Sequence, residues 1–465
     1  MHPKRTSRAF GTSLPTSVLT LLLASTWASC PYVTATNEQL DVPHILEPDV
    51  QQLLNANQPN ETASKSHHPW THKPDCFHTT STKVAKTKYC VYNYNRVKGQ
   101  PITIITTPNT ATNIIESETL DEEPIEIFIS RKQQDDWLEG EVKPAYEIVD
   151  MEGKDKGVVA TRKIKKYETF MIDTVLVASD LDLDKAVIRA KRAEELALGV
   201  DRLPDPSVVR SLSARAGKKK AKKEENADKD AKADGEGKES DIEEAVGELE
   251  MRVMRTNAFG IQAQGVGMKG LFPEVSRINH ACNPNAFVMF SPSGLSVGIK
   301  SYREIQPGEE ITISYLLLGQ KSTDRQAGLR KWGFKCSCDL CSSPPSVLAA
   351  SDERRVRISS SENSLVDLWK VGQVQSAIRL AEEIVDLMKE EELESMLTDE
   401  YVILARLHLL LEEKNKAEEY AELAVEELKN LGFLGVDERE WDDWNLEKLL
   451  KTFGEAAAAM RKAEQ

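Results

Sequence analysis

Apolar and polar residues alternate with a short period in the first half of the chain and with a helical period in the second half. β-Branched and aromatic residues recur from Tyr89 to Ile105 and are interrupted by Gly99-Gln100-Pro101, which predicts a β-hairpin. The alternation Ile-Glu-Ile-Phe-Ile over residues 125–129 predicts a further strand. We therefore expect a small β-rich region over residues 76–135.

A second series of short strands begins near Tyr146. Val158-Val159-Ala160 and Thr169 to Val177 are its clearest members, and strands resume between Ala286 and Ile313. Apolar residues from Leu183 to Leu198 recur with helical spacing and predict one helix within this series. The pattern indicates a domain built mainly from short strands.

The residues that follow Pro344-Pro345 change to a helical period. Apolar residues three and four positions apart mark successive amphipathic helices that begin near Leu365, Ala377, Tyr401 and Ala417. Small alanines at the expected crossings suit closely packed helical hairpins, resembling tetratricopeptide repeats. We therefore predict an all-α domain over residues 346–465, which we expect to bind a peptide or protein partner.

Two segments lack the apolar residues that a core requires. Residues 30–75 contain Asn, Gln, Pro, Thr and His without a sustained period, and we interpret them as a linker. The stretch 211–245 is dominated by charge and predicts a disordered insert within a domain. Its lysine run, Lys218–Lys223, is either a nuclear signal or part of a solvated loop.

The first 29 residues have the features of a secretory signal peptide. Basic residues at positions 4, 5 and 8 precede an apolar run over 18–24, and small residues follow at 28 and 29. The alternative is a disordered N-terminus with a chance apolar patch. A signal predicts secretion or residence in the endoplasmic reticulum, where Cys76 and Cys90 would form a disulfide. Without it, the two are unconnected thiols, and the nucleus or cytoplasm is expected.

Composition restricts the class of protein. The net charge is −15, whereas a general nucleic-acid binder carries a basic surface, so we expect no direct nucleic-acid binding. An acidic surface instead suits a basic protein substrate. Hydrophobic residues make up 40% of the chain, which is ordinary for a globular protein. No segment reaches about 18 consecutive apolar residues, so we predict no membrane span.

Three closely spaced cysteines, Cys336, Cys338 and Cys341, predict a metal site. Cys336 and Cys338 are too near for an easy disulfide with each other. A structural zinc ion takes four ligands, with sulfur at about 2.3 Å, so a fourth residue must come from elsewhere. Cys282 is the remaining thiol in this half of the chain, and His280 is the alternative. The other interpretation is a set of free or disulfide-bonded cysteines.

Four segments carry a more specific pattern. They are Gly-Lys-Asp-Lys-Gly-Val-Val-Ala-Thr-Arg at 153–162, Arg-Ile-Asn-His-Ala-Cys-Asn-Pro-Asn at 277–285, Gly-Glu-Glu-Ile-Thr-Ile-Ser-Tyr at 308–315, and Trp-Gly-Phe-Lys-Cys-Ser-Cys-Asp-Leu-Cys at 332–341. In this order they resemble the SET-domain lysine methyltransferases, particularly the branch that includes the SET-and-MYND proteins. The second segment matches the family's Asn-His-x-Cys-x-Pro-Asn signature at every defined position. A MYND finger is not expected, because its cysteines are absent.

The resemblance implies an α+β fold: a SET domain of short strands with a pseudoknot over 144–335, and a post-SET zinc loop over 336–345. The helical domain would follow. Two positions depart from the family pattern. Asp155 stands where a second glycine is common, and Tyr167 replaces a frequent turn glycine.

The resemblance also implies S-adenosylmethionine as the methyl donor and a lysine side chain of a protein, a histone being one candidate, as the acceptor. The Tyr315 hydroxyl would lie beside the transferring methyl group and orient the amine. One structural zinc ion would be held by Cys282, Cys336, Cys338 and Cys341. The implied cofactor-binding residues are Lys154, Lys156 and Gly157 at the methionine end, Asn279 through its amide, His280 through backbone groups near the adenine, and Phe334 stacked on the adenine.

Other interpretations of these residues stay open at this point. Tyr315 is otherwise an ordinary strand tyrosine, and Phe334 a core aromatic. The domain is alternatively a catalytically silent SET scaffold whose helical C-terminal domain acts as a protein-binding module. A purely structural zinc protein would explain the cysteines but not the other motifs.

Overall fold

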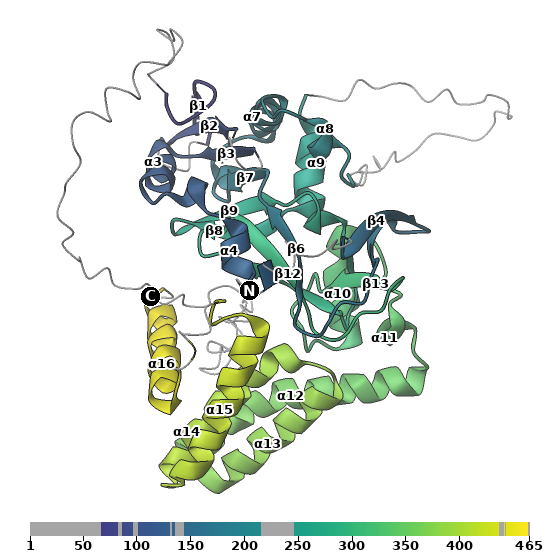
Figure 1. The fold of residues 1–465 in the computed structure, drawn as a ribbon, viewed down its shortest axis with the longest axis vertical. Coiled ribbons are helices and arrows are strands. Elements are labelled where there is room, and N and C mark those ends of the chain that lie inside the picture. The colour runs from purple at the N-terminus through teal and green to yellow at the C-terminus, as the bar shows by residue number, and fades with distance from the viewer. Residues whose placement is uncertain are drawn as a thin grey trace, which may run out of the picture. The chain divides into compact units, whose positions relative to one another are not determined.

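The computed structural model describes residues 67–81, 86–95, 101–130, 133–134, 144–214, 246–436, 441 and 443–463 (Figure 1). The predicted signal peptide, residues 30–66 of the predicted linker and residues 215–245 of the predicted charged insert lie outside these ranges. The chain divides into two compact units. The strand-rich unit runs to Tyr315 and includes Leu329–Lys335, and the helical unit contains Leu316–Gly328 and the residues from Cys336 onward.

The largest sheet of the strand-rich unit has six strands. Their order is β1 (Asp75–His78), β2 (Lys88–Tyr94), β3 (Ile102–Thr106), β7 (Val177–Asp180), β9 (Val266–Leu271) and β8 (Phe259–Ala263). Strands β2 and β3 pair antiparallel and confirm the predicted hairpin. Strand β3 pairs parallel with β7, so the N-terminal strands continue a sheet whose other members lie much later in the chain.

Both faces of this sheet are covered, which explains the nearly continuous apolar sequence of its strands. Tyr89 and Val91 of β2 belong to one hydrophobic core, whereas Cys90 and Tyr92 belong to another. The alternation follows from the two-residue period of a strand. The helical and 3₁₀ elements of this unit are α3 (Pro108–Glu116), η1 (Thr119–Asp121), α4 (Pro124–Phe128), α6 (Leu183–Ala186), α7 (Arg189–Asp201), α8 (Ser207–Arg210), α9 (Glu248–Asn257), η2 (Val275–Arg277) and η3 (Arg330–Trp332).

Two predicted elements differ in the structure. Residues 125–129 were expected to form a strand, but they lie largely within the short helix α4, with Pro124 at its start. Phe128 and Ile129 are buried while Ile125 is 44% exposed, a distribution that five residues of alternating sequence do not reveal. The helix predicted between Leu183 and Leu198 is divided into α6 and α7, because the chain is extended at Val187 and Ile188.

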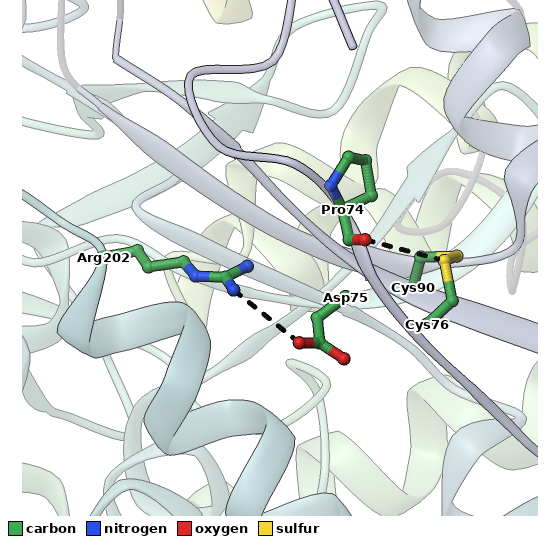
Figure 2. The surroundings of a disulfide bond; sticks show 5 residues. All are labelled: Pro74, Asp75, Cys76, Cys90 and Arg202. Atoms are coloured by element: carbon green, nitrogen blue, oxygen red, sulfur yellow. Dashed lines mark hydrogen bonds and ion pairs between the residues drawn. A yellow bond between two sulfur atoms is a disulfide. The ribbon is translucent and has the colours of Figure 1, made fainter. Parts of the chain in front are cut away.

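A disulfide joins Cys76 of β1 to Cys90 of β2 (Figure 2). The two residues face each other in the antiparallel register. Beside them, the Arg202 guanidinium lies 3.8 Å from the Asp75 carboxylate (Figure 2). The structure therefore contains the disulfide that the sequence left open.

Two smaller sheets also occur among the described residues of the strand-rich unit. Strand β13 pairs parallel with β10 and antiparallel with β5, which places three of the four recognised segments in one sheet. This four-stranded sheet has the order β10 (Asn279–His280), β13 (Glu310–Ile313), β5 (Asp155–Ala160) and β4 (Tyr146–Met151). The three-stranded sheet has the order β11 (Ala286–Phe290), β12 (Ser296–Ser301) and β6 (Thr169–Thr174).

The helical unit confirms the change of period after Pro344-Pro345. Its elements are α10 (Ser322–Leu329), whose last residue falls in the other unit, α11 (Asp339–Ser342), α12 (Pro345–Lys370), α13 (Val374–Glu390), η4 (Glu394–Met396), α14 (Leu397–Leu410), α15 (Lys414–Leu431) and α16 (Leu446–Ala463). Ala377, Ala381 and Ala424 are fully buried in its core, where small side chains let helices approach closely. Assignment to a repeat family stays a prediction. Among the described residues, no helix has the length and apolar character that a bilayer span requires.

Candidate active site and metal centre

The candidate active site is built where β10 runs beside β13. Asn279 pairs with Thr312 and His280 with Ile313, and the Ala281 N–H continues the ladder to the Ile313 carbonyl at 3.1 Å. Just beyond this pairing, the Tyr315 N–H donates to Nδ1 of His280 at 3.0 Å. The signature segment is therefore brought beside β13 and the residues just after it, which include Tyr315.

Aromatic rings surround Tyr315. The ring centres of His280, Trp332 and Phe334 lie 5.3, 5.2 and 6.5 Å from that of Tyr315, and we call these four residues the aromatic cluster. The Tyr315 hydroxyl donates to the Ile278 carbonyl at 2.7 Å, which fixes the direction of its proton. Trp332 was not assigned from the sequence, although it lies two residues before Phe334 in the fourth recognised segment. Its indole N–H donates to the Thr256 carbonyl at 3.2 Å.

The Asn279 amide connects the signature to the glycine-bearing strand β5. Its Nδ2 donates to the Lys156 carbonyl and to Oε1 of Glu310, each at 3.0 Å. A Cβ on Gly157 would lie 2.0 Å from Met151 Sδ and 3.0 Å from Asn279 Nδ2, so a larger residue would displace both neighbours. A glycine is therefore required at position 157 because Met151 and Asn279 pack against it.

The lysines of the first segment form ion pairs near the surface. Lys154 Nζ lies 2.5 Å from Glu310 Oε2, and Lys156 Nζ lies 2.5 Å from Asp150 Oδ1. The Lys154 side chain is 43% exposed and the Lys156 side chain is 37% exposed, so these pairs stabilise the fold only weakly.

Both departures from the family pattern occur at left-handed backbone positions. Asp155 has φ 71° and Tyr167 has φ 62°, a region that favours glycine. The Asp155 carboxylate also accepts a hydrogen bond from the Ser213 hydroxyl. The chain therefore keeps the turn geometry for which a glycine is suited while carrying other residues there.

Asn285, the last residue of the signature, anchors β13. It is 3% exposed, accepts the Thr312 N–H at 2.8 Å through Oδ1 and donates through Nδ2 to the Glu310 carbonyl at 2.9 Å. Its Nδ2 also donates to Glu309 Oε1 at 3.1 Å. Burial opposes ionisation of Glu309, but hydrogen bonds from Arg303, the Gln306 N–H and Asn285 together hold its pKa below the usual value. Asn285 therefore holds β13 in position through these hydrogen bonds, and it was not assigned from the sequence.

A buried carboxyl group positions the chain just before the signature. Asp173 Oδ2 accepts the Glu274 N–H at 2.7 Å and the Val275 N–H at 3.0 Å, at the start of η2. Burial raises the pKa of Asp173 to about 7, although these backbone donors oppose the rise. The Tyr146 hydroxyl donates to the nearby Glu274 carboxylate.

The four cysteines assigned to zinc come together. The Sγ atoms of Cys282, Cys336, Cys338 and Cys341 all lie within 4.8 Å of one another. Sulfur ligands at about 2.3 Å from one zinc ion are separated by about 3.8 Å in a tetrahedron, so the donor set and its spacing fit zinc. His280, the alternative ligand, is not part of this group, and its Nε2 lies 3.4 Å from Cys282 Sγ.

Part of the chain is similar to a known protein family. Residues 155–316 match the SET domain family. The match covers about a third of the chain, and it contains β5, the signature and Tyr315. This part of the chain therefore matches a SET domain.

The particular relatives are methyltransferases. The chain is 33% identical over 132 residues to mouse histone-lysine N-methyltransferase SMYD3, covering 28% of this chain and 27% of the relative. It is 32% identical over 124 residues to histone-lysine N-methyltransferase set5 of Schizosaccharomyces pombe, covering 26% and 39%. Human N-lysine methyltransferase SMYD2 is 29% identical over 133 residues, covering 28% of each chain. The matched segments thus span between about a quarter and two fifths of these relatives' own lengths.

Proposed function

We propose that this protein is an S-adenosylmethionine-dependent protein-lysine N-methyltransferase. The observation that carries the proposal is the fixed Tyr315 hydroxyl, which lies within the aromatic cluster at the end of the strand beside Asn279 and His280. The SET domain match and the lysine methyltransferases among the relatives support this assignment.

Methyl transfer depends more on the alignment of the amine with the methyl group than on acid–base catalysis. S-adenosylmethionine supplies a methyl group on a sulfonium sulfur, and the nucleophile is a neutral lysine amine. A free lysine has a pKa of about 10.4, and apolar surroundings lower it by disfavouring the charged ammonium. The aromatic cluster provides such surroundings. The Tyr315 hydroxyl, whose proton is held by the Ile278 carbonyl, would present its oxygen to the amine and orient it.

His280 is poorly suited to act as a general base. Its Nδ1 accepts the Tyr315 N–H, and its Nε2 faces Cys282 Sγ at 3.4 Å, so both ring nitrogens have protein partners. A general base must reach the proton that it removes. We therefore assign His280 to positioning and to cofactor contact through its backbone.

The remaining cofactor contacts are assigned from the hydrogen-bond donors and acceptors of each residue. Asn279 uses Nδ2 within the protein, which leaves Oδ1 to accept an N–H of the cofactor. The backbone of Lys154, Lys156 and Gly157 would meet the methionine end. Phe334 is half-buried in the aromatic cluster and would offer a ring face to the adenine.

We further propose one structural zinc ion at Cys282, Cys336, Cys338 and Cys341. Four sulfur donors close the coordination sphere, which is typical of structural rather than catalytic zinc. The zinc would hold the segment around Cys336, and therefore Phe334 two residues earlier, in place.

Substrate, partner and compartment are proposals as well. The acceptor is a lysine of a protein, and the net charge of −15 favours a basic one such as a histone. The helical unit is the proposed site for a peptide or protein partner. The Cys76–Cys90 disulfide supports passage through an oxidising compartment, with the nucleus or cytoplasm as the alternative.

The competing proposal is a silent scaffold that binds partners through the helical unit. The intact contacts of Asn279, His280 and Tyr315 favour the enzyme. The deciding experiment incubates purified protein with radiolabelled S-adenosylmethionine and a mixed protein extract, and then identifies methyl-lysine after hydrolysis. Calorimetry on the same protein measures cofactor binding. Label in methyl-lysine supports the enzyme, whereas cofactor binding without transfer, or no binding at all, supports the scaffold.

A further inference from the structure

The loop that carries three of the zinc-site cysteines is held by a side chain outside the cysteine set. Gln326 lies on α10, and its Oε1 accepts the Cys336 N–H at 3.1 Å. Its Nε2 donates to the Cys336 carbonyl at 3.1 Å and lies 3.5 Å from Cys341 Sγ. One amide therefore holds both backbone groups of one cysteine and contacts the sulfur of another.

Helix α10 is itself anchored to α12 within the same compact unit. The Ser322 N–H donates to Asp352 Oδ1 at 2.6 Å, and the Ser322 hydroxyl donates to the same carboxylate. Arg325 is 2% exposed, and its Nη1 lies 3.8 Å from Asp352 Oδ1. Ser322, Arg325 and Gln326 are three and four positions apart, so they share one face of the helix.

We propose that Gln326 is a positioning residue for the zinc site. By fixing the Cys336 backbone, it orients this thiol before the metal binds, and by donating toward Cys341 Sγ it stabilises the thiolate. Side chains that orient metal ligands in this way typically contribute about 10- to 100-fold to metal affinity. The inference rests on the zinc site proposed above and assigns a residue outside its ligand set.

Substituting the amide by a carboxylate tests this role with almost no change of shape. In Gln326→Glu, one oxygen still accepts the Cys336 N–H, but both donated contacts are lost and a negative charge faces the thiolates. Gln326→Asn is a milder variant, because the shorter side chain cannot reach all three partners. The matched control is Gln375→Glu, the same chemical change at an exposed position of α13.

The experiment titrates zinc-loaded full-length protein with a chromogenic chelator and records the absorption of the cobalt-substituted protein. We expect zinc affinity about 10- to 100-fold weaker in Gln326→Glu, a smaller loss in Gln326→Asn, and no change in Gln375→Glu. The thiolate-to-cobalt charge-transfer band should move to longer wavelength in the Gln326 variants, because a sulfur that loses a hydrogen-bond donor gives up its electrons more easily. A merely structural role would not move this band.

The outcomes separate this proposal from the zinc site itself. Wild type that binds zinc, with both Gln326 variants unchanged in affinity and spectrum, overturns the positioning role alone. Wild type that takes up no metal overturns the zinc site and the positioning role together. If Gln326→Glu does not fold, Gln326→Asn decides between the same two results.

Discussion

The backbone N–H of Tyr315 donates to Nδ1 of His280 over 3.0 Å. An Nδ1 that accepts a hydrogen bond leaves the proton of a neutral ring on Nε2, and Nε2 faces the Cys282 sulfur at 3.4 Å. One imidazole therefore connects the strand end that carries the candidate catalytic hydroxyl to a thiol of the candidate zinc site. The His280 side chain therefore positions the chain at Tyr315 relative to the segment that carries Cys282.

Removing the Tyr315 hydroxyl should slow methyl transfer without weakening cofactor binding. Tyr315→Phe keeps the ring within the aromatic cluster and deletes only the oxygen that donates to the Ile278 carbonyl. One well-placed polar group is worth about 3 kcal/mol in an acyl-transfer site, and methyl transfer is less polar. We expect kcat lower by about tenfold to a thousandfold. Steady-state kinetics and calorimetry measure the two effects, and full activity in Tyr315→Phe would refute the assigned role.

Truncating Asn279 should act on cofactor affinity first. Asn279→Ala removes Oδ1, the proposed acceptor for the cofactor, and leaves the Lys156 carbonyl without its donor. We expect the dissociation constant of S-adenosylmethionine to rise by about two- to tenfold from one lost hydrogen bond, and by more if β5 shifts. Thermal unfolding of the same variant separates the direct effect from a general loss of stability. An unchanged dissociation constant would exclude Asn279 from the cofactor site.

Replacing Cys282 should remove most of the bound zinc. We expect one zinc ion per chain in wild type and markedly less in Cys282→Ser, because a hydroxyl is a poor substitute for a thiolate ligand. Cys76→Ser is the matched control, since Cys76 pairs with Cys90 and lies outside the cysteine group. Metal analysis by mass spectrometry measures the ratio, and equal zinc in the two variants would remove Cys282 from the site.

The sequence predicted the parts of the site that depend on side-chain identity at fixed spacing. Cys336, Cys338 and Cys341 lie within six consecutive residues, so their proximity follows from local geometry, whereas the proximity of Cys282 depends on the fold. Contacts that depend on how separate elements pack could not be predicted from the sequence. Gln326 is an unremarkable helix residue until α10 lies beside the Cys336 loop, and Trp332 contacts Tyr315 only because the chain returns to it.

The fold likewise contains elements that local sequence predicts and elements that depend on tertiary contacts. Long periodic segments such as α13 and α15 were predicted because many residues repeat one pattern. The helix α4 was missed because its few residues fit a strand as well as a helix, and tertiary burial of Phe128 decides between them. The parallel pairing of β3 with β7 joins distant segments and has no local signal.

The disulfide should stabilise the fold by an amount that increases with the logarithm of the length of the loop that it closes. Cys76 and Cys90 are separated by 14 positions, and a loop of about 15 residues corresponds to about 3 kcal/mol. Cys76→Ala should lower the free energy of unfolding by about this amount, while the buried Cys90 thiol stays as a small apolar group. Urea unfolding measures the loss, and peptide mapping without reduction checks the bond. If the peptides that contain Cys76 and Cys90 are both alkylated before reduction, in protein from an oxidising compartment, the disulfide is absent.

The stability of the protein should depend on pH through Asp173. Burial raises its pKa from the ordinary value of 3.8 to about 7, so the folded protein keeps this proton over a range in which the unfolded chain has released it. Between about pH 4 and pH 7 the folded state binds more protons, and the free energy of unfolding therefore falls as the pH rises. The stabilisation is fully present below the unfolded pKa and is lost as the pH rises through the folded one.

Asp173→Asn tests this effect, because its amide oxygen can still accept the Glu274 and Val275 N–H groups, although its NH2 group can no longer accept the Thr174 N–H. We expect the free energy of unfolding of wild type to fall relative to that of the variant by about 4 kcal/mol as the pH rises from about 4 to about 8. The Glu274 carboxylate and the Tyr146 hydroxyl adjoin the site, and both remain in the variant. Asp150→Asn, at an 85% exposed side chain, is the control that should follow wild type at every pH. Urea unfolding across this range measures all three proteins, and parallel curves for wild type and Asp173→Asn would show that Asp173 titrates normally in the folded state.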